Sequence, residues 1–421
     1  MCPWISVSQI LAHCSPEMVF QWTSSTSCSV PYVASCGEAS YPKDYYGLLG
    51  GLALEWLRGG SWEEVARELG ELRAGEPSPC RVAGSTVAEP LPVARRAYSL
   101  YADVNLNDPA SWPSVTKLLE GISRVLEELR LGHRWLVAVS GGSEAVLTGL
   151  YIAREYTRGR VVVASSAAHA SVLKAARVLG MEVKLVQVDS RLRIDLYALE
   201  KTLRGVQNVA AIVATAGVTD NGAVDPVRDV AKLAWEHGAV VYVDAAFGGL
   251  PLLGLGSTET VLPRGGPALA GIDFHKHVAP PPSSILVSNT AELRDYIVFP
   301  APYMPLGRQE TLLWTRPASG LAAAYAALRA LGASGVGELA RYLYRLASKL
   351  ASILEQRGVE LLSPLDTPLV AFRPPSVEGA LKRLRRRGWI LYPSRLPGIL
   401  RYVAKWCHEP GDVEEIAEAV A

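Results

Sequence analysis

The sequence predicts an α/β fold in which helices cover both faces of a mostly parallel central sheet, together with a small C-terminal α/β subdomain. Three observations support this prediction. Between residues 135 and 288, short apolar runs alternate with helical stretches, the pattern of successive β–α units. After Gly320 the pattern changes to two long helical segments followed by short strands and helices. The 421 residues are also enough for two subdomains.

The composition is that of a globular protein. Hydrophobic residues make up 49% of the chain and charged residues 20%. A net charge of +1 gives no electrostatic basis for binding nucleic acid or an anionic membrane, and we interpret the basic run at 382–387 as a solvated helix face. We find no signal peptide and no apolar stretch long enough to span a membrane. The six cysteines match no zinc-site spacing, so we expect a cytoplasmic protein with reduced thiols and no metal.

The first part of the chain differs from the rest. Residues 1–45 contain one lysine, no arginine and no periodicity, which is typical either of a poorly ordered arm or of an over-extended reading frame. Residues 46–72 have helical periodicity, and Ser61 before two glutamates suits a helix start. We therefore predict four regions: an N-terminal arm, an N-terminal segment, a large domain and a small domain, at 1–60, 61–113, 114–317 and 318–421.

The remaining elements follow from local patterns. A loop at 104–109 precedes an amphipathic helix at 114–130. Apolar runs predict buried strands at 135–139, 161–164, 183–188, 209–214, 239–243 and 284–287. The helix at 226–237 is expected to have Asp225 as its cap, Pro226 in its first turn and Gly238 after its end. In the C-terminal part we predict helices at 318–331, 336–357, 376–387 and 411–420, and strands near 359–362, 368–373 and 398–404.

Polar residues and glycines follow several of these strands. Ser140, Gly141, Gly142 and Ser143 join a strand to a helix, where free amides and hydroxyls can hold a phosphate. A plain tight turn would explain the same residues. The segment is not GxGxxG, which disfavours a nicotinamide cofactor. His169 and Thr215 also follow predicted strands; the simpler interpretations are a structural histidine and a turn residue.

Asp244 and Lys276 suggest a specific chemistry. Asp244 ends a buried strand, and the small residues after it, including Ala246, leave room for a ring, although an acid there could also cap a helix. Lys276 lies between His275 and His277; most lysines are surface residues, but a buried one has a lowered pKa and becomes a nucleophile. An acid for a pyridinium nitrogen and a lysine for a Schiff base are the two groups that pyridoxal 5′-phosphate requires.

The order of these residues resembles a known family. The segments SGGSEA, HASVLKA, DAAFGG, DFHKH and LRYV, with Ser85-Thr86 and the loop at 105–109, are similar to those of group II pyridoxal-phosphate-dependent decarboxylases of fold type I. The archaeal tyrosine/aspartate decarboxylases, which supply tyramine or β-alanine, are the most similar group. The resemblance covers about residues 61–421. It implies a fold type I architecture, an amino-acid substrate, a homodimer and a place in coenzyme A biosynthesis.

The resemblance also implies residue roles. Lys276 would form the Schiff base, Asp244 would pair with the ring nitrogen, and His169 would stack on the ring. The cofactor would also contact Ser140, Gly141, Gly142, Ser143, Thr215, Ala246 and His275. Arg401 would hold a substrate carboxylate, with Asn105 nearby, and Tyr303 would lie on a mobile loop as proton donor.

Some positions depart from the family pattern. Ser283-Ser284 replace a glycine pair, and Trp314 stands where a glycine is expected before Thr315-Arg316, in a loop that often reaches the neighbouring subunit's phosphate. His408 is displaced by one place from the family histidine.

Three alternatives remain open from the sequence. A lyase similar to sphingosine-phosphate lyase usually carries a membrane anchor, and a cysteine desulfurase would need a mobile catalytic cysteine, for which Cys407 is the late candidate. A non-catalytic homologue is supported only by the altered positions.

Overall fold

The computed structural model describes residues 61–420. The chain divides into two units, with the boundary in the sequence between Gly75 and Glu76. The first unit contributes α2, Trp62–Ala74. Ser61 caps this helix: its hydroxyl accepts from the Glu64 amide, and the Glu64 carboxylate accepts from the Ser61 amide. The predicted helix start at Ser61 is confirmed, whereas the predicted arm at 1–60, with the helical pattern at 46–60, lies outside the described residues.

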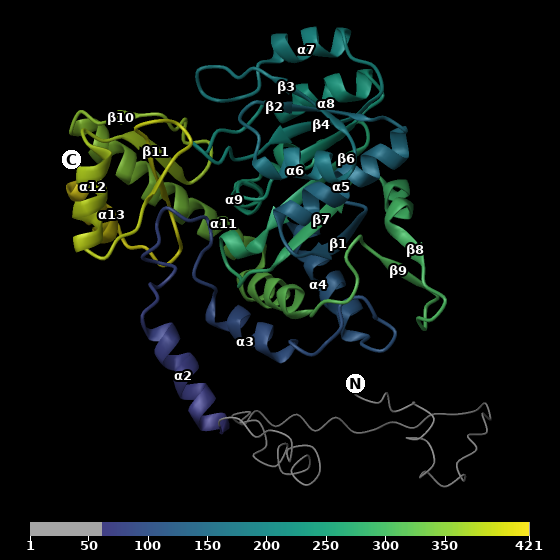
Figure 1. The fold of residues 1–421 in the computed structure, drawn as a ribbon, viewed down its shortest axis with the longest axis horizontal. Coiled ribbons are helices and arrows are strands. Elements are labelled where there is room, and N and C mark those ends of the chain that lie inside the picture. Colours follow the sequence, from purple (N-terminus) through teal and green to yellow (C-terminus); the bar gives the residue numbers. More distant parts are fainter. Residues whose placement is uncertain (1–60, 421) are drawn as a thin grey trace, which may run out of the picture. The chain divides into compact units, whose positions relative to one another are not determined.

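The second unit is built around a seven-stranded sheet in the order β1-β7-β6-β5-β4-β2-β3 (Figure 1). Strand β7 is antiparallel to both its neighbours, and all other pairings are parallel. The mostly parallel sheet predicted from the sequence is therefore confirmed. Its strands are β1 Trp135–Val139, β2 Val161–Ser165, β3 Glu182–Val186, β4 Val209–Thr215, β5 Val240–Asp244, β6 Ala268–Asp273 and β7 Ser284–Ser288.

Helices bury apolar residues against both faces of this sheet. On one face, side chains such as Ile212 and Val241 join a core with α4 Ser114–Glu128, α7 Leu196–Arg204, α8 Val227–Glu236 and α9 Gly249–Gly254. On the other face, Val213 and Tyr242 pack with α5 Gly142–Thr157 and α6 Ala170–Val178. Because neighbouring residues of a strand point to opposite faces, strands buried on both sides become continuous apolar runs, which is why they were recognisable in the sequence.

One strand of the sheet was missed, and one predicted helix cap is wrong. Strand β6 was not predicted, since its alternation of small residues, Ala-Leu-Ala-Gly-Ile, has weak strand propensity. Asp225 does not cap α8: Pro226 is the capping residue, and the Asp225 carboxylate instead accepts the amides of Ile194 and Thr215 at 2.7 Å each. The Asp225 carboxylate therefore binds amides that are distant in the sequence instead of the amides at the start of α8.

A smaller four-stranded sheet, in the order β10-β11-β13-β12, forms the C-terminal part. The strands are β10 Glu360–Leu361, β11 Leu369–Arg373, β12 Tyr392–Pro393 and β13 Leu400–Val403, packed with α12 Val377–Arg386 and α13 Pro410–Val420. A two-stranded hairpin, β8 Val298–Pro300 and β9 Arg308–Glu310, was not predicted. The remaining elements are α3 Pro92–Leu100, α10 Thr258–Val261 and the 3₁₀ helices η3 Phe274–Lys276 and η4 Ala291–Ile297.

The long helix α11, Ser319–Gln356, connects the two sheets. Its backbone leaves helical geometry at Gly332, so the two helices predicted here are both present and meet at that glycine. Residues of its first half, such as Leu321, belong to the core of the large sheet, and residues of its second half, such as Leu350, to the core of the small one. The boundary at 317/318 stays a prediction. None of the helices in residues 61–420 combines the length and hydrophobicity needed to cross a membrane.

A segment at 79–91 is fastened to the C-terminal part by several bonds. Cys80 and Cys407 form a disulfide, so the expectation of reduced thiols is wrong for this pair. Beside it, the buried Lys405 ammonium donates to the carbonyls of Pro79, Val82 and Val87. The His408 ring lies 2.7 Å from the Cys80 carbonyl oxygen, and burial lowers its pKa to about 4. The sequence could not reveal this pairing because the two cysteines are 327 residues apart.

We expect the double variant Cys80→Ser/Cys407→Ser to lower the free energy of unfolding by about 2–5 kcal/mol, because it removes a cross-link that restricts the unfolded chain. Urea unfolding followed by circular dichroism measures the change. Reductant should shift the midpoint of the unsubstituted protein toward that of the variant and leave the variant unaffected. A midpoint insensitive to reductant, with both cysteines found free by peptide mass spectrometry, would contradict the disulfide.

Candidate active site

The candidate site lies at one edge of the large sheet, where the parallel strands end. Ser140 follows β1, Thr215 ends β4, Asp244 ends β5 and Asp273 ends β6, while Ser284 begins the antiparallel β7 at the same edge. Ligands of open α/β sheets bind in the crevice outside this edge. A cavity of about 600 Å³ lies here. It is lined by Ser140, Gly141, Gly142, Ser143, His169, Thr215, Asp244, Ala246, His275, Lys276 and Arg401, among others.

Lys276 lies in a cluster of charged and polar groups. Its ammonium nitrogen is 3.1 Å from Oδ2 of Asp273, and that oxygen is 3.5 Å from Nε2 of His275. The Ser284 hydroxyl donates to the other Asp273 oxygen at 2.6 Å. Burial lowers the pKa of His275, partly opposed by Asp273. Asp273 is almost completely buried, so this network fixes its carboxylate with respect to the lysine.

Asp244 and His169 line the same cavity. Burial raises the pKa of Asp244, and Lys276 and His169 oppose this shift. Among the described residues, the Asp244 carboxylate accepts one long hydrogen bond, from the Ala246 amide at 3.3 Å. His169 caps α6, with Nδ1 accepting from the Ser171 amide at 3.3 Å. Nδ1 also lies 2.8 Å from the Ser171 hydroxyl oxygen, and burial lowers the pKa of His169, which favours the neutral ring.

The turn at 140–143 forms the start of α5. Helix N-termini present free amides and a partial positive charge, which suits a phosphate. A Cβ atom at Gly142 would lie 3.0 Å from the Ala246 Cβ and 3.1 Å from Oδ2 of Asp273, so the cavity wall is tight at this glycine. The Glu144 carboxylate accepts from the Ser140 amide at 2.6 Å and is neutralised by Arg316 at 2.5 Å. Arg316 therefore contacts Glu144, directly after the turn at 140–143 of the same chain.

Two buried polar atoms without a hydrogen-bond partner indicate whether the site residues fit pyridoxal phosphate. Oγ1 of Thr215 and Nε of Arg401 are buried without a hydrogen-bond partner among the described residues, and both side chains line the cavity. Buried polar atoms are rarely left unpaired, so each calls for a ligand. Together with an acid, a lysine and an amide-rich turn, they match the ring, aldehyde and phosphate of pyridoxal phosphate, and the residues present fit this group.

Two expected site residues lie elsewhere. Tyr303 is 69% exposed, beside Trp314 at 6.3 Å between ring centroids, and does not line the cavity. Asn105 accepts from the Asn107 amide and bridges to Pro317, also outside the cavity. A single chain therefore does not bring either residue to the other site residues.

The structure adds lining residues to which the sequence gave no role. Asp273 was noted only as part of the DFHKH segment, because the strand that it ends was not recognised. Thr86 reaches the cavity from the fastened segment at 79–91. Phe247 and Leu369 supply apolar surface to the cavity. The Arg401 guanidinium donates a hydrogen bond to the carbonyl oxygen of Thr219 at 2.6 Å. Only tertiary folding brings these segments together.

A mostly parallel seven-stranded sheet with this set of side chains at its strand ends defines a fold type I pyridoxal-phosphate enzyme. The family model described as the pyridoxal-dependent decarboxylase conserved domain matches residues 153–374, more than half of the chain. The chain belongs to this family of amino-acid decarboxylases, and its cofactor is pyridoxal 5′-phosphate.

Curated relatives agree with this assignment. A probable L-tyrosine/L-aspartate decarboxylase of Methanopyrus kandleri is 33% identical over 359 residues, covering 81% of this chain and 95% of that protein. A probable L-aspartate decarboxylase of Archaeoglobus fulgidus is 30% identical over 349 residues, covering 81% and 94%.

Solved structures share the fold. A sphingosine-1-phosphate lyase of Burkholderia pseudomallei superposes with a TM-score of 0.77 at 22% identity, covering 90% of this chain and 94% of that one. A glutamate decarboxylase of Lactobacillus brevis gives 0.73 at 16% identity, covering 93% and 94%. At these identities the likeness concerns architecture alone.

Proposed function

We propose that this enzyme decarboxylates L-aspartate or L-tyrosine, yielding β-alanine or tyramine, and that Lys276 holds its cofactor through a Schiff base. The observation that carries the proposal is the shared cavity of Lys276, Asp244 and Arg401, which offers a nucleophile, an acid for the ring and a cation for a carboxylate. The names of the relatives from Methanopyrus kandleri and Archaeoglobus fulgidus support the choice of these two amino acids.

Each residue has a proposed task. Lys276 would hold the cofactor aldehyde, Asp244 would accept the ring N–H, and the turn at 140–143 would bind the phosphate with its amides. Thr215 and His169 would contact the ring from the cavity wall. When bound, pyridoxal phosphate supplies an electron sink for the charge left by departing carbon dioxide. As a carboxylate, Asp244 would stabilise positive charge on the ring nitrogen from a position fixed before reaction.

Substrate handling would fall to other groups. The Arg401 guanidinium, held by the Thr219 carbonyl and with Nε unpaired, would bind a substrate carboxylate. Two proton sources for the α-carbon are proposed. One is His169, which lines the cavity, and the other is Tyr303, which would need a neighbouring subunit or a loop movement to arrive.

Measurement of carbon dioxide release from each of the twenty amino acids tests the substrate. We expect one of the two proposed amino acids to give a kcat/KM at least about tenfold above every other, because an unpaired polar group in a buried site strongly disfavours the wrong side chain. Glutamate is the matched control for aspartate and phenylalanine for tyrosine. Release from neither proposed amino acid, with turnover of a third, would refute the substrate assignment and leave the family intact.

The alternatives are weaker in the light of the structure. A desulfurase would use Cys407 as nucleophile, but its sulfur is bonded to Cys80 and the residue does not line the cavity. For a carbon–carbon lyase, the support is the similar fold of the sphingosine-1-phosphate lyase, and at 22% identity that likeness concerns the architecture alone.

Three further expectations remain part of the proposal: a homodimer, a cytoplasmic location, and a supply of β-alanine to coenzyme A biosynthesis if aspartate is the substrate. The homodimer is proposed from the family resemblance, and the neighbouring exposed rings of Tyr303 and Trp314 offer apolar surface that another subunit would cover.

A further inference from the structure

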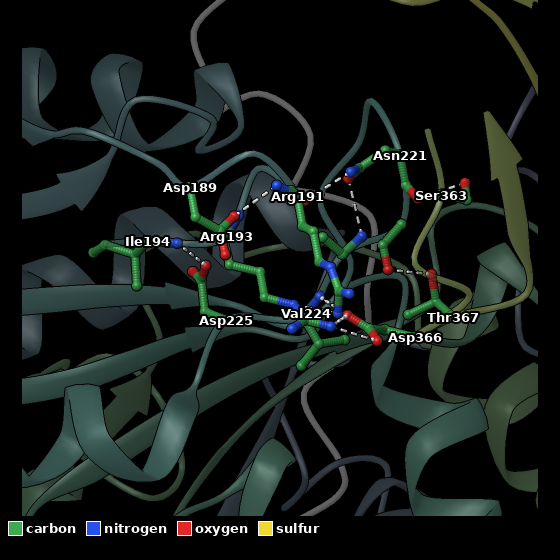
Figure 2. A network of polar contacts seen from close by, with 12 residues as sticks. Asp189, Arg191, Arg193, Ile194, Asn221, Val224, Asp225, Ser363, Asp366 and Thr367 are labelled. Carbon is green, nitrogen blue, oxygen red and sulfur yellow. Dashed lines mark hydrogen bonds and ion pairs between the residues drawn. The ribbon is translucent and has the colours of Figure 1, made fainter. Parts of the chain in front are cut away.

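The loop between β4 and α8, residues 216–225, is bonded to three separate segments of the C-terminal part. Arg401 donates to the Thr219 carbonyl at 2.6 Å. Arg395 pairs with Asp220 at 2.6 Å and also donates to the carbonyls of residues 167 and 168. The third segment, residues 362–367, makes the largest set of contacts (Figure 2). The loop also supplies Gly217 and Thr219 to the cavity wall.

The third set of contacts centres on Arg193 and Asp366. The Arg193 guanidinium donates to both Asp366 oxygens, from Nη2 at 2.8 and 2.6 Å and from Nε at 3.1 Å. Oδ2 of Asp366 also accepts from the Val224 amide at 3.0 Å, so one carboxylate binds the loops that follow β3 and β4 to the C-terminal part. Figure 2 shows these groups pointing toward one another. The side chains are 27% and 22% exposed, so water screens this ion pair less than a surface pair.

Weaker bonds extend the same junction. The Asn221 amide donates to the carbonyls of Arg191 and Leu362, and the Ser363 hydroxyl donates to the Asn221 carbonyl. The Thr367 hydroxyl donates to the Gly222 carbonyl at 2.7 Å. Gly222 has a φ of +76°, and a Cβ atom there would lie 2.5 Å from Oγ1 of Thr367. The backbone at Gly222 therefore packs closely against Thr367, and this contact holds the two segments together in addition to the ion pair.

We propose that Arg193 and Asp366 form a positioning latch that sets where Arg401 stands over the cavity and thereby determines the affinity for substrate. Arg401 lies on β13 of the small sheet, whereas Asp244 ends β5 of the large sheet and Lys276 lies in η3, directly after β6. The distance between the carboxylate-binding group and the cofactor-binding groups therefore depends on how segment 362–367 sits on loop 216–225. Neither latch residue lines the cavity, so both act through Arg401. This inference rests on the proposed role of Arg401.

Steady-state kinetics at saturating cofactor tests the latch. We expect Arg193→Ala to raise KM about tenfold, with a smaller effect on kcat, because a bidentate charge-assisted contact that orients a binding group is lost. Arg193→Lys, which keeps the charge but not the paired geometry, should give an intermediate KM and serves if the alanine variant does not fold. Cofactor affinity, measured by absorbance titration, should be unchanged. Arg387→Ala, which removes an ion pair to Glu418 within the C-terminal part, is the matched control.

A double variant separates the latch from general loss of structure. In an Arg401→Ala background, Arg193→Ala should raise KM no further, because the latch would act through a group already absent. Additive effects on KM, or an unchanged KM in Arg193→Ala while Arg401→Ala raises it, would overturn the latch alone. If Arg401→Ala itself leaves KM unchanged, the proposed carboxylate-binding role is wrong and the latch falls with it.

Discussion

Replacement of Lys276 by alanine is expected to abolish decarboxylation, with a loss of kcat on the order of 10⁴-fold or more, because the covalent nucleophile is removed. The visible absorbance of the bound cofactor should disappear, and borohydride should no longer fix the cofactor to the protein. Absorbance spectra and mass spectrometry of the borohydride-treated protein measure both effects.

Lys276→Arg is the informative companion variant. It keeps a cation beside Asp273, 3.1 Å from the lysine nitrogen in the native chain, but cannot form the Schiff base. Loss of activity in both variants assigns the effect to covalency rather than to charge. Lys201→Ala, an exposed lysine of α7, should behave as the unsubstituted protein. Borohydride attachment of the cofactor at another lysine would disprove the assignment of Lys276.

Replacement of Asp244 by asparagine is expected to lower kcat by about 10²–10³-fold, because a fixed charge that stabilises the developing charge is lost. The cofactor should still be attached through Lys276, so borohydride should still fix it. Burial already raises the pKa of Asp244, and Lys276, His169 and the Ala246 amide oppose this effect. A positively charged ring nitrogen would therefore strongly favour the ionised acid.

Asp229→Asn is the control for this substitution, since Asp229 is an exposed acid in the first turn of α8. Stopped-flow absorbance after mixing with substrate distinguishes slow chemistry from weak binding. Unchanged kcat in Asp244→Asn would show that this acid does not support the ring nitrogen, whatever the role of Lys276.

Most strands of the large sheet were predictable because burial on both faces leaves a continuous apolar run in the sequence. Strand β6 escaped because its small residues, such as Ala270 and Gly271, have little strand propensity and are held by neighbouring strands on both sides. The site followed the same rule. Asp244 and the turn at 140–143 stand at the ends of predicted strands, where chain order alone implies convergence, whereas Lys276 follows the unpredicted β6. Their presence in one cavity agrees with that expectation, while their roles stay predictions.

The sequence by itself determined the alternation of strands and helices, and the residue types that could bind a pyridine ring, an aldehyde and a phosphate. Only the tertiary structure decided that Cys80 bonds with Cys407, that Asp225 accepts distant amides instead of capping a helix, and that Arg193 pairs with Asp366. The physical reason is range: hydrophobic periodicity and strand ends are local properties of the chain. Each of these three contacts instead depends on how separate segments pack, and no local pattern encodes that packing.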